Sequence, residues 1–386
     1  MIGATMEPDL IDALSLAQDL IRAPSITPDK GGAIGVLADA LRSLGFDVID
    51  LPFGDGAERT PNLFARLGTA GPHLCFAGHT DVVPPGDVGW TSGPFDAAVR
   101  GNVLYGRGAC DMKGGIAAFV GAVARHLGGR QRLNGSVSLL ITGDEEGPAT
   151  YGTVKVLEWM AVNGQIPDFC VVGEPTNPDR MGDVVKIGRR GSLNARIVVH
   201  GVQGHVAYPQ RADNPIHRLM AILSDLTAHP LDEGTEWFEP SSVQVTSVDV
   251  GNDATNVIPA RASARLNIRF NDRHTGKDLA HWITRSVRAY APGAEIEIRV
   301  SGEAFLTPRT PQLDMLLEAV QQVTGRQPRL DTGGGTSDAR FISHYCPVAE
   351  FGLVGASMHK VNEHVPIVDL QVLTDIYAAF IERLMA

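Results

Sequence analysis

Residues 136–147 read SVSLLITGDEEG, and this stretch decides the fold. Its apolar part has no charged residue, which is typical of a strand that is buried on both faces of a sheet. Two similar runs, HLCFAGH at 73–79 and DFCVVG at 168–173, lie before and after it. The segments at about 113–127 and 150–161 have helical spacing. Apolar strands that alternate with helices predict an α/β fold with a mostly parallel sheet covered by helices.

The pattern changes near residue 184, where longer strands with alternating apolar and polar residues begin, for example ARASARLNIRF. This alternation predicts an antiparallel sheet with one face in water. The α/β pattern returns after about residue 301. We therefore predict one α/β domain formed by residues 1–183 and 302–386, interrupted by an inserted α+β domain at 184–301.

The composition indicates a folded protein and argues against several classes. Of 386 residues, 44% are hydrophobic and 20% are charged, which is enough apolar material for a packed core. The net charge of −11 argues against a nucleic-acid-binding protein, whose surface is usually basic. No stretch approaches the ~20 apolar residues that cross a bilayer, and the N-terminus has no pattern of a secretory signal. The four cysteines form no CxxC pair, so we expect a reduced, cytoplasmic protein without a thiolate zinc site.

Each of the three buried strands is followed by side chains that bind metals. His79 ends one strand and precedes Asp81, Glu145 and Glu146 follow another, and Glu174 follows the third. The carboxyl ends of parallel strands form the edge at which open α/β folds bind ligands. A buried cluster of carboxylates and histidine is unstable without a compensating cation. The sequence therefore predicts a metal site at this edge of the sheet.

Two further residues extend this set: Asp111 in GRGACDMKGG and His359 in SMHKVNEHVP. Histidine and carboxylate ligands without cysteine suit Zn²⁺, with Co²⁺ or Mn²⁺ as possible substitutes. Taken singly, each piece also has an ordinary interpretation as a polar turn, a helix cap or a surface histidine. Three of the pieces end strands of one predicted sheet, however, so together they favour a metal site. The glycine-rich segment around Asp111 does not match the spacing of a phosphate-binding loop.

The complete set of motifs resembles a known enzyme family. HTDVVPPGD, LYGRGACDMKGG, TGDEEG, VGEPT, GVQGHVAYP and MHKVNEHVP occur in this order. The order is similar to that of the di-zinc amidohydrolase and exopeptidase family, and the resemblance spans about residues 8–384. It implies a zinc-exopeptidase-like catalytic α/β domain with an inserted lid and dimerisation domain.

The resemblance also implies how two zinc ions per subunit would be bound. His79 and Glu174 would hold one ion, and Glu146 and His359 would hold the other. Asp111 would bridge the two ions. Co²⁺ is expected to be able to replace zinc at these positions.

Three further residues would have catalytic roles by the same resemblance. Glu145 would be the general base. Asp81 would orient the imidazole of His79 from behind the metal. His205, in GVQGHVAYP, would reach the active site of the partner subunit and stabilise the oxyanion. Without the resemblance, His205 would be interpreted as a structural histidine at the end of a strand.

Several segments are most similar to the desuccinylase branch of the family, among them TNVIPARASARLNIRF and GGGTSDARF. This implies cleavage of N-succinyl-LL-2,6-diaminopimelate to succinate and LL-2,6-diaminopimelate, in lysine and diaminopimelate biosynthesis. The substrate has several carboxylates, which arginine can bind through two parallel hydrogen bonds. Some arginines of the inserted domain would be ordinary surface charges. The candidate substrate contacts are Arg189, Arg190, Ser192, Asn256, Arg269, Gly335 and Thr336.

Alternatives to this activity remain open. An acetylornithine deacetylase or an aminoacylase would share every metal ligand and differ only in its pocket, and a dipeptidase of the same family is a further alternative. A non-catalytic metal-binding homologue is disfavoured because it would not need Glu145 beside Glu146. We expect a cytoplasmic homodimer that acts on a small N-acyl amino acid and binds neither nucleic acid nor membrane.

Overall fold

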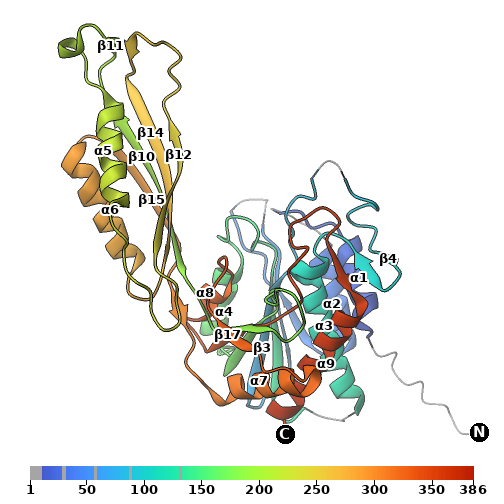
Figure 1. The fold of residues 1–386 in the computed structure, drawn as a ribbon. Helices are drawn as coiled ribbons and strands as arrows, with labels where there is room; N and C mark the ends of the chain where they lie inside the picture. Colours follow the sequence, from blue (N-terminus) through green and yellow to red (C-terminus); the bar gives the residue numbers. More distant parts are fainter. Residues whose placement is uncertain (1–10, 28–31, 56–58, 87–88, 130–132) are drawn as a thin grey trace, which may run out of the picture. The chain divides into compact units, whose positions relative to one another are not determined.

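The computed structural model describes residues 11–27, 32–55, 59–86, 89–129 and 133–386 (Figure 1). The chain forms two compact units, which are described separately below. The first unit comprises the residues up to Ile187, Thr307–Asp331 and Ser337–Ala386, and the second comprises Gly188–Leu306 and Thr332–Thr336. The predicted limits of the inserted domain, 184 and 301, differ from the limits of the second unit's longer segment by a few residues. The assignment of the inserted segment as a lid and dimerisation domain stays a prediction.

The first unit is built on an eight-stranded mixed sheet. In spatial order its strands are β1 (Asp47–Asp50), β2 (Asn62–Leu67), β6 (Ser136–Thr142), β3 (His73–His79), β7 (Phe169–Val172), β18 (Val348–Glu350), β8 (Val184–Lys186) and β17 (Arg329–Asp331). The central strands β6, β3, β7 and β18 are parallel. Antiparallel pairs join β1 to β2, β2 to β6 and β18 to β8. The predicted α/β class is therefore confirmed, with antiparallel pairs outside the central strands.

Helices cover both faces of this sheet (Figure 1). Phe76 of β3 packs on Phe119 and on Tyr377, with ring centroids 4.4 Å and 5.8 Å apart. Phe64 of β2 packs instead on Trp159. Phe64 and Phe76 point to opposite faces, because they pair with consecutive residues of β6. The helices are α1 (Ala13–Arg22), α2 (Ala33–Ser43), α3 (Gly114–Gly129, with Phe119), α4 (Thr153–Val162, with Trp159), α7 (Pro311–Thr324), α8 (Ala339–Ile342) and α9 (Ile367–Leu384, with Tyr377).

Local sequence determines where the longer helices begin and end. Thr310 precedes α7 and its side chain accepts a backbone N–H of the first turn, and Pro311 follows as the first helical residue. Gly325 ends α7 with φ at 70°, a left-handed conformation that favours glycine. In the part of the chain that the structure describes, no helix is both long and apolar enough to cross a bilayer.

A small sheet and a kinked turn complete the first unit near the metal-ligand candidates. The small sheet consists of β4 (Ala98–Arg100), β5 (Val103–Tyr105) and β19 (His364–Pro366). The kinked turn, Ala109–Lys113, leads directly into α3, and the backbone of Asp111 within it is not helical. Asp111 therefore lies in an irregular segment at the start of α3.

The second unit contains a four-stranded antiparallel sheet, two longer helices and a small two-stranded antiparallel sheet. Leu193 and Ile197 of the sheet are buried in one apolar cluster with Ile222 and Ile283 of the two helices. Arg196 alternates with these residues and faces the opposite side, as in a sheet with one covered face. The sheet order is β12 (Ser242–Asp249), β14 (Arg261–Phe270), β10 (Gly191–His200), β15 (Glu295–Gly302); the helices are α5 (Pro215–Thr227) and α6 (Gly276–Tyr290); the small sheet pairs β11 (Gly204–His205) with β13 (Val257–Ile258).

The longer segment of the second unit, Gly188–Leu306, begins and ends with two neighbouring strands. β9 (Gly188–Arg189) pairs antiparallel with β16 (Phe305–Leu306). In the first unit the flanking residues are also adjacent, because the N–H of Thr307 donates a hydrogen bond to the carbonyl oxygen of Ile187 at 2.7 Å.

Asp232 is a buried hydrogen-bond acceptor in the loop between α5 and β12. Its carboxylate accepts the N–H of Gly234 at 2.7 Å, the N–H of Ser241 at 3.2 Å and the side-chain amide of Asn271 at 2.6 Å. The ring nitrogen of His274 lies 2.9 Å from the same carboxylate. Burial alone would raise the pKa of Asp232, but these hydrogen bonds hold it well below its usual value.

The substitution Asp232→Asn is expected to lower the free energy of unfolding at pH 7 by about 1–3 kcal/mol, because buried donors lose a charged acceptor. The pKa of Asp232 is lower in the folded than in the unfolded state. Its stabilisation is therefore present above the unfolded-state value of about 4 and is lost as the pH falls towards the folded-state value. Urea unfolding of both proteins should show a difference that shrinks from pH 7 to acid pH. A difference that is the same at every pH would contradict this account.

Candidate metal centre

Three neighbouring parallel strands bring metal-binding side chains to one edge of the first unit's sheet. His79 is the last residue of β3. Glu145 and Glu146 lie in the turn after β6, and Glu174 lies two residues beyond β7. Because β3 is hydrogen-bonded to both β6 and β7, the three strand ends are adjacent.

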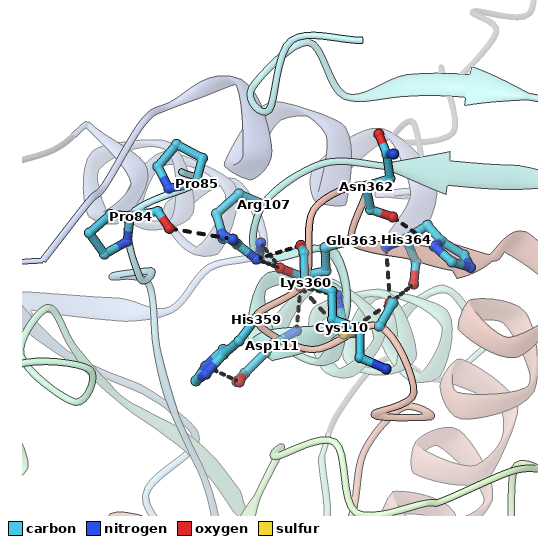
Figure 2. Close-up of polar contacts among 12 residues, drawn as sticks. Pro84, Pro85, Arg107, Cys110, Asp111, His359, Lys360, Asn362, Glu363 and His364 are labelled. Atoms are coloured by element: carbon cyan, nitrogen blue, oxygen red, sulfur yellow. Dashed lines mark hydrogen bonds and ion pairs between the residues drawn. The ribbon is translucent and has the colours of Figure 1, made fainter. Parts of the chain in front are cut away.

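Asp111 lies at the centre of the cluster. Its Oδ1 is 3.3 Å from Nε2 of His79, and its Oδ2 is 3.2 Å from Nε2 of His359. Nε2 of His79 is also 3.6 Å from Oε1 of Glu174, and Nε2 of His359 is 2.8 Å from Oε1 of Glu146. Figure 2 shows the contact between Asp111 and His359. The structure thus brings all five candidate ligands together, with one histidine on each side of Asp111.

The residues of this cluster fit a divalent cation. Nε2 of His79 and Oδ1 of Asp111 are buried and lie 3.3 Å apart, but their contact lacks the geometry of a good hydrogen bond. Poor pairing of buried polar atoms costs about 1–3 kcal/mol each, and a metal ion would bind both. Ligand atoms of His79, Asp111 and Glu146 lie within 4.8 Å of one another, as do those of His79, Glu145 and Glu174. Imidazole with carboxylate is a donor set that suits zinc and related ions.

The carboxylates shift the pKa values of both histidines upward. Burial lowers the pKa of His79, but Asp111 and Glu174 more than reverse this and raise it well above its usual value. Hydrogen bonds to Asp111 and Glu146 raise the pKa of His359 to about 10. The cluster therefore needs positive charge, which either protons on the histidines or a bound cation can supply.

Glu145 differs electrostatically from the other carboxylates of the cluster. Burial and the nearby charge of Glu174 raise its pKa well above its usual value. A carboxyl group with a raised pKa is suited to accept and return a proton near neutral pH. Its distance from His79 and Glu174 would also allow it to bind a metal, so geometry alone leaves both roles possible.

Asp81 makes contacts that the sequence reasoning missed. Nδ1 of His79 lies 2.8 Å from the backbone carbonyl oxygen of Asp81, whereas the carboxylate is 3.7 Å away. Nδ1 must carry the proton to donate to a carbonyl, which leaves Nε2 as the metal-binding atom. The carboxylate of Asp81 instead accepts the N–H of Glu145 at 3.2 Å and that of Glu146 at 3.0 Å. Asp81 therefore holds the turn that carries the base candidate and one ligand candidate, a contact for which the sequence offers no signal.

Gly115, four residues after Asp111, lets the start of α3 approach the end of β7 closely. A Cβ atom at Gly115 would lie only 2.6 Å from the carbonyl oxygen of Gly173. The first turn of α3 therefore packs directly on the backbone that precedes Glu174. This close approach places Asp111 beside the strand ends.

The candidate substrate residues all lie in the second unit. Nη1 of Arg189 donates to the carbonyl oxygens of Gly335 at 3.0 Å and Gly333 at 3.3 Å, so this side chain holds the glycine-rich loop. Arg190 forms an ion pair of 3.2 Å with the exposed Glu239. Among the remaining candidates, Ser192 accepts a hydrogen bond from Asn267. Arg269 lies on β14, and Thr336 follows Gly335 directly. Asn256 lies just before β13.

His205 is exposed on β11, which pairs with β13 at one end of the second unit (Figure 1). Its Nδ1 accepts the N–H of Ala207 at 3.1 Å, which fixes the ring orientation. The carbonyl oxygen of Asn256, just before β13, accepts the N–H of Val206 at 3.1 Å, so Asn256 lies beside the residue that follows His205.

This fold and this cluster are those of a metal-dependent hydrolase: the chain belongs to the peptidase family M20/M25/M40, whose pattern it matches over residues 75–383. The family resemblance inferred from the motifs is thereby confirmed. The chain is 78% identical over 385 residues to a succinyl-diaminopimelate desuccinylase of Gluconacetobacter diazotrophicus, covering 100% of both chains. It is 62% identical over 382 residues to the enzyme of that name from Gluconobacter oxydans, covering 99% of both.

A solved structure shows the same fold at low identity. The YXEP protein of Bacillus subtilis, described as a dinuclear metal binding peptidase of the M20 family, superposes with a TM-score of 0.71. The identity is 19%, and 97% of each chain is covered. At this identity the likeness is evidence for the fold alone.

Proposed function

We propose that this protein hydrolyses the amide bond of N-succinyl-LL-2,6-diaminopimelate, which yields succinate and LL-2,6-diaminopimelate for lysine and diaminopimelate biosynthesis. The observation that carries this proposal is the 78% identity to a succinyl-diaminopimelate desuccinylase over the whole length of both chains. The cluster around Asp111 supplies the ligands that such a metal-dependent hydrolase needs. We place this biosynthetic reaction in the cytoplasm.

Two divalent cations would be bound by the cluster. His79 and Glu174 would hold one, and Glu146 and His359 the other, with one oxygen of Asp111 facing each histidine. We propose zinc for both positions, with cobalt as a possible substitute. When bound, two such cations polarise a carbonyl group and lower the pKa of an attacking water molecule.

Glu145 would move the proton during the reaction. Its carboxylate takes a proton from the attacking water and returns it to the nitrogen of the leaving amine. The raised pKa of Glu145 favours the protonated form, which the second step requires. Asp81 holds the N–H of Glu145 and so limits where this carboxylate can lie.

The second unit would bind the carboxylates of the substrate. Arg189 already donates to two carbonyl oxygens of the glycine-rich loop, so we assign it to positioning Gly335 and its neighbour Thr336. Arg190 has an exposed partner, Glu239, which a substrate carboxylate can replace at little cost. Arginine at this position, with Ser192, Asn256 and Arg269, would therefore recognise the two ends of the substrate.

We also propose a homodimer that forms through the second unit. β12 lies at an edge of the four-stranded sheet and pairs with β14 alone among the described strands. Val245 and Val248 on this edge are 37% and 55% exposed. Unprotected edges with apolar side chains favour pairing with another chain. In such a dimer, the exposed His205 would enter the partner's active site and donate a hydrogen bond to the oxyanion.

The test is succinate release from N-succinyl-LL-2,6-diaminopimelate by the zinc-loaded protein, beside N-acetylornithine, simple dipeptides and a chelated control. We expect turnover of the succinyl compound alone, with complete loss after chelation. Turnover of N-acetylornithine or of a dipeptide instead would keep the metal site and reject the proposed substrate. Zinc binding without turnover of any of these compounds would reject the catalytic function.

A further inference from the structure

Glu363 is a fully buried carboxylate on the segment that carries His359, and it is surrounded by donors. Its Oε2 accepts a hydrogen bond from Nη1 of Arg107 at 2.7 Å and from the N–H of Gly108 at 3.1 Å. Its Oε1 accepts the N–H of Cys110 at 3.0 Å and that of Asp111 at 3.2 Å (Figure 2). The thiol of Cys110 also donates to Oε1 at 3.3 Å. Oε2 therefore has two donors and Oε1 has three, one of which is the backbone N–H of Asp111, the central ligand candidate.

Arg107 connects the same carboxylate to a third segment. Besides Glu363, its guanidinium donates to the carbonyl oxygen of Lys360 at 3.2 Å and to that of Pro84 at 3.4 Å. Lys360 follows His359 directly, and Pro84 lies five residues after His79 in the sequence. Figure 2 shows Arg107 between these segments. The buried ion pair thus joins the three stretches of backbone that carry both histidines and Asp111.

The segment around His359 has a backbone that needs such external support. His359 has φ at 61° and Asn362 has φ at 57°, a left-handed conformation that residues other than glycine rarely adopt. Surrounding contacts must maintain it. The carbonyl oxygen of Glu363 accepts the N–H of Gly106 at 2.9 Å, so its backbone and its side chain bind the same neighbouring segment.

We propose that Glu363 is a positioning residue for the metal centre: through Arg107 and the N–H groups of Gly108, Cys110 and Asp111, it holds Asp111 and His359 at the separation that metal binding requires. This inference rests on the proposed function, because it takes Asp111 and His359 to be ligands. Residues that orient metal ligands typically change metal affinity 10–100-fold when they are replaced.

Glutamine at position 363 would keep the shape of the side chain but could not accept hydrogen bonds at both of its terminal atoms. Every group facing the carboxylate is a donor, so an amide nitrogen would face two or three donors in place of an acceptor. The charge of the buried Arg107 would also lose its partner. The backbone at Asp111 or at Gly108 must then move, and the ligand separation changes with it.

The test uses Co²⁺ alone as the probe, because its visible absorption reports ligand geometry. The metal-free full-length protein is titrated with CoCl₂, followed by absorbance and calorimetry, as wild type, Glu363→Gln and Asp232→Asn. Asp232→Asn is the matched control, since it removes a carboxylate that also accepts several hydrogen bonds but belongs to the second unit, which contains none of the five ligand candidates. For Glu363→Gln we expect about 10–100-fold weaker Co²⁺ binding and an altered absorption spectrum. For Asp232→Asn we expect a lower Tm with unchanged Co²⁺ affinity and spectrum.

Two further variants keep the inference testable. If Glu363→Gln does not fold, Glu363→Asp retains the charge beside Arg107 but is one methylene shorter, and it should weaken Co²⁺ binding for the same reason. The double variant Arg107→Gln/Glu363→Gln removes the unpaired charge but leaves the amide groups unsatisfied, so we expect no recovery of affinity. Recovery in the double variant would show that the inference is wrong.

The outcomes separate this inference from the function on which it rests. Glu363→Gln with a lower Tm and wild-type Co²⁺ binding would reduce Glu363 to a purely structural role. Wild-type protein that binds no Co²⁺ would overturn the proposed metal centre itself, and the role of Glu363 with it. If the wild-type protein binds two Co²⁺ ions and only the Glu363 variants lose affinity, the result supports both the metal centre and the positioning role of Glu363.

Discussion

The variant Glu145→Gln is expected to lose about 10²–10⁴-fold in kcat, the usual contribution of a general acid–base residue. The amide of glutamine cannot accept the proton of the attacking water, although its shape is nearly that of glutamate. Both metals should stay bound, because the five ligand candidates are untouched. Rates of succinate release and elemental analysis of the purified protein measure the two quantities.

Glu146→Gln is the matched control for this experiment, since the adjacent residue has its carboxylate 2.8 Å from His359. We expect this variant to lose metal as well as activity. The two variants together decide whether Glu145 is a general base or a metal ligand. Loss of a metal ion from Glu145→Gln would make Glu145 a ligand and leave the general base to be found elsewhere.

The variant His205→Ala is expected to lower kcat by about 10²–10³-fold, the effect of removing one donor to an oxyanion. His205 is exposed and its ring accepts only a local N–H, from Ala207, among its described hydrogen bonds, so the fold should be unaffected. The metal content should not change. His200→Ala is the control, because His200 is an exposed histidine of the same unit that pairs with Glu295. A normal rate for His205→Ala would return His205 to a structural role.

Mixing two inactive variants tests whether His205 acts across a dimer. In a mixed dimer of Glu145→Gln and His205→Ala subunits, one active site would combine an intact Glu145 with the partner's intact His205. Random exchange of equal amounts should therefore restore about a quarter of the wild-type activity. Absence of any recovery from a verified mixed dimer would show that His205 does not act on the partner's site.

The sequence predicts the position of the strand-end ligands for a clear physical reason. Parallel strands align their carboxyl ends, so His79, Glu146 and Glu174 meet once the sheet is known. The two kinds of sheet could also be distinguished, because strands covered on both faces are uniformly apolar and strands covered on one face alternate. The antiparallel neighbours of the central strands were not predicted, since their direction depends on pairing and not on local pattern.

The remaining parts of the site depend on contacts between distant residues. Asp111 has an extended backbone in a kinked turn and His359 a left-handed one, and neither follows from hydrophobic periodicity. Their expected roles came from the family resemblance. The ion pair of Arg107 with Glu363 joins residues that are 256 positions apart, and no local signal in the sequence indicates it. The same holds for the carbonyl and carboxylate contacts of Asp81.

The pairing of β9 with β16 affects which insertions and deletions this chain can accept. The hydrogen bond between Ile187 and Thr307 places the two residues of the first unit that flank the inserted segment side by side. A turn of a few residues could close this gap, and the cost of closing a loop rises only slowly with its length. Residues 188–306 can therefore be lengthened, shortened or exchanged at this point without altering the strand order that aligns the metal ligands, while Thr332–Thr336 of the second unit would stay in the remaining chain.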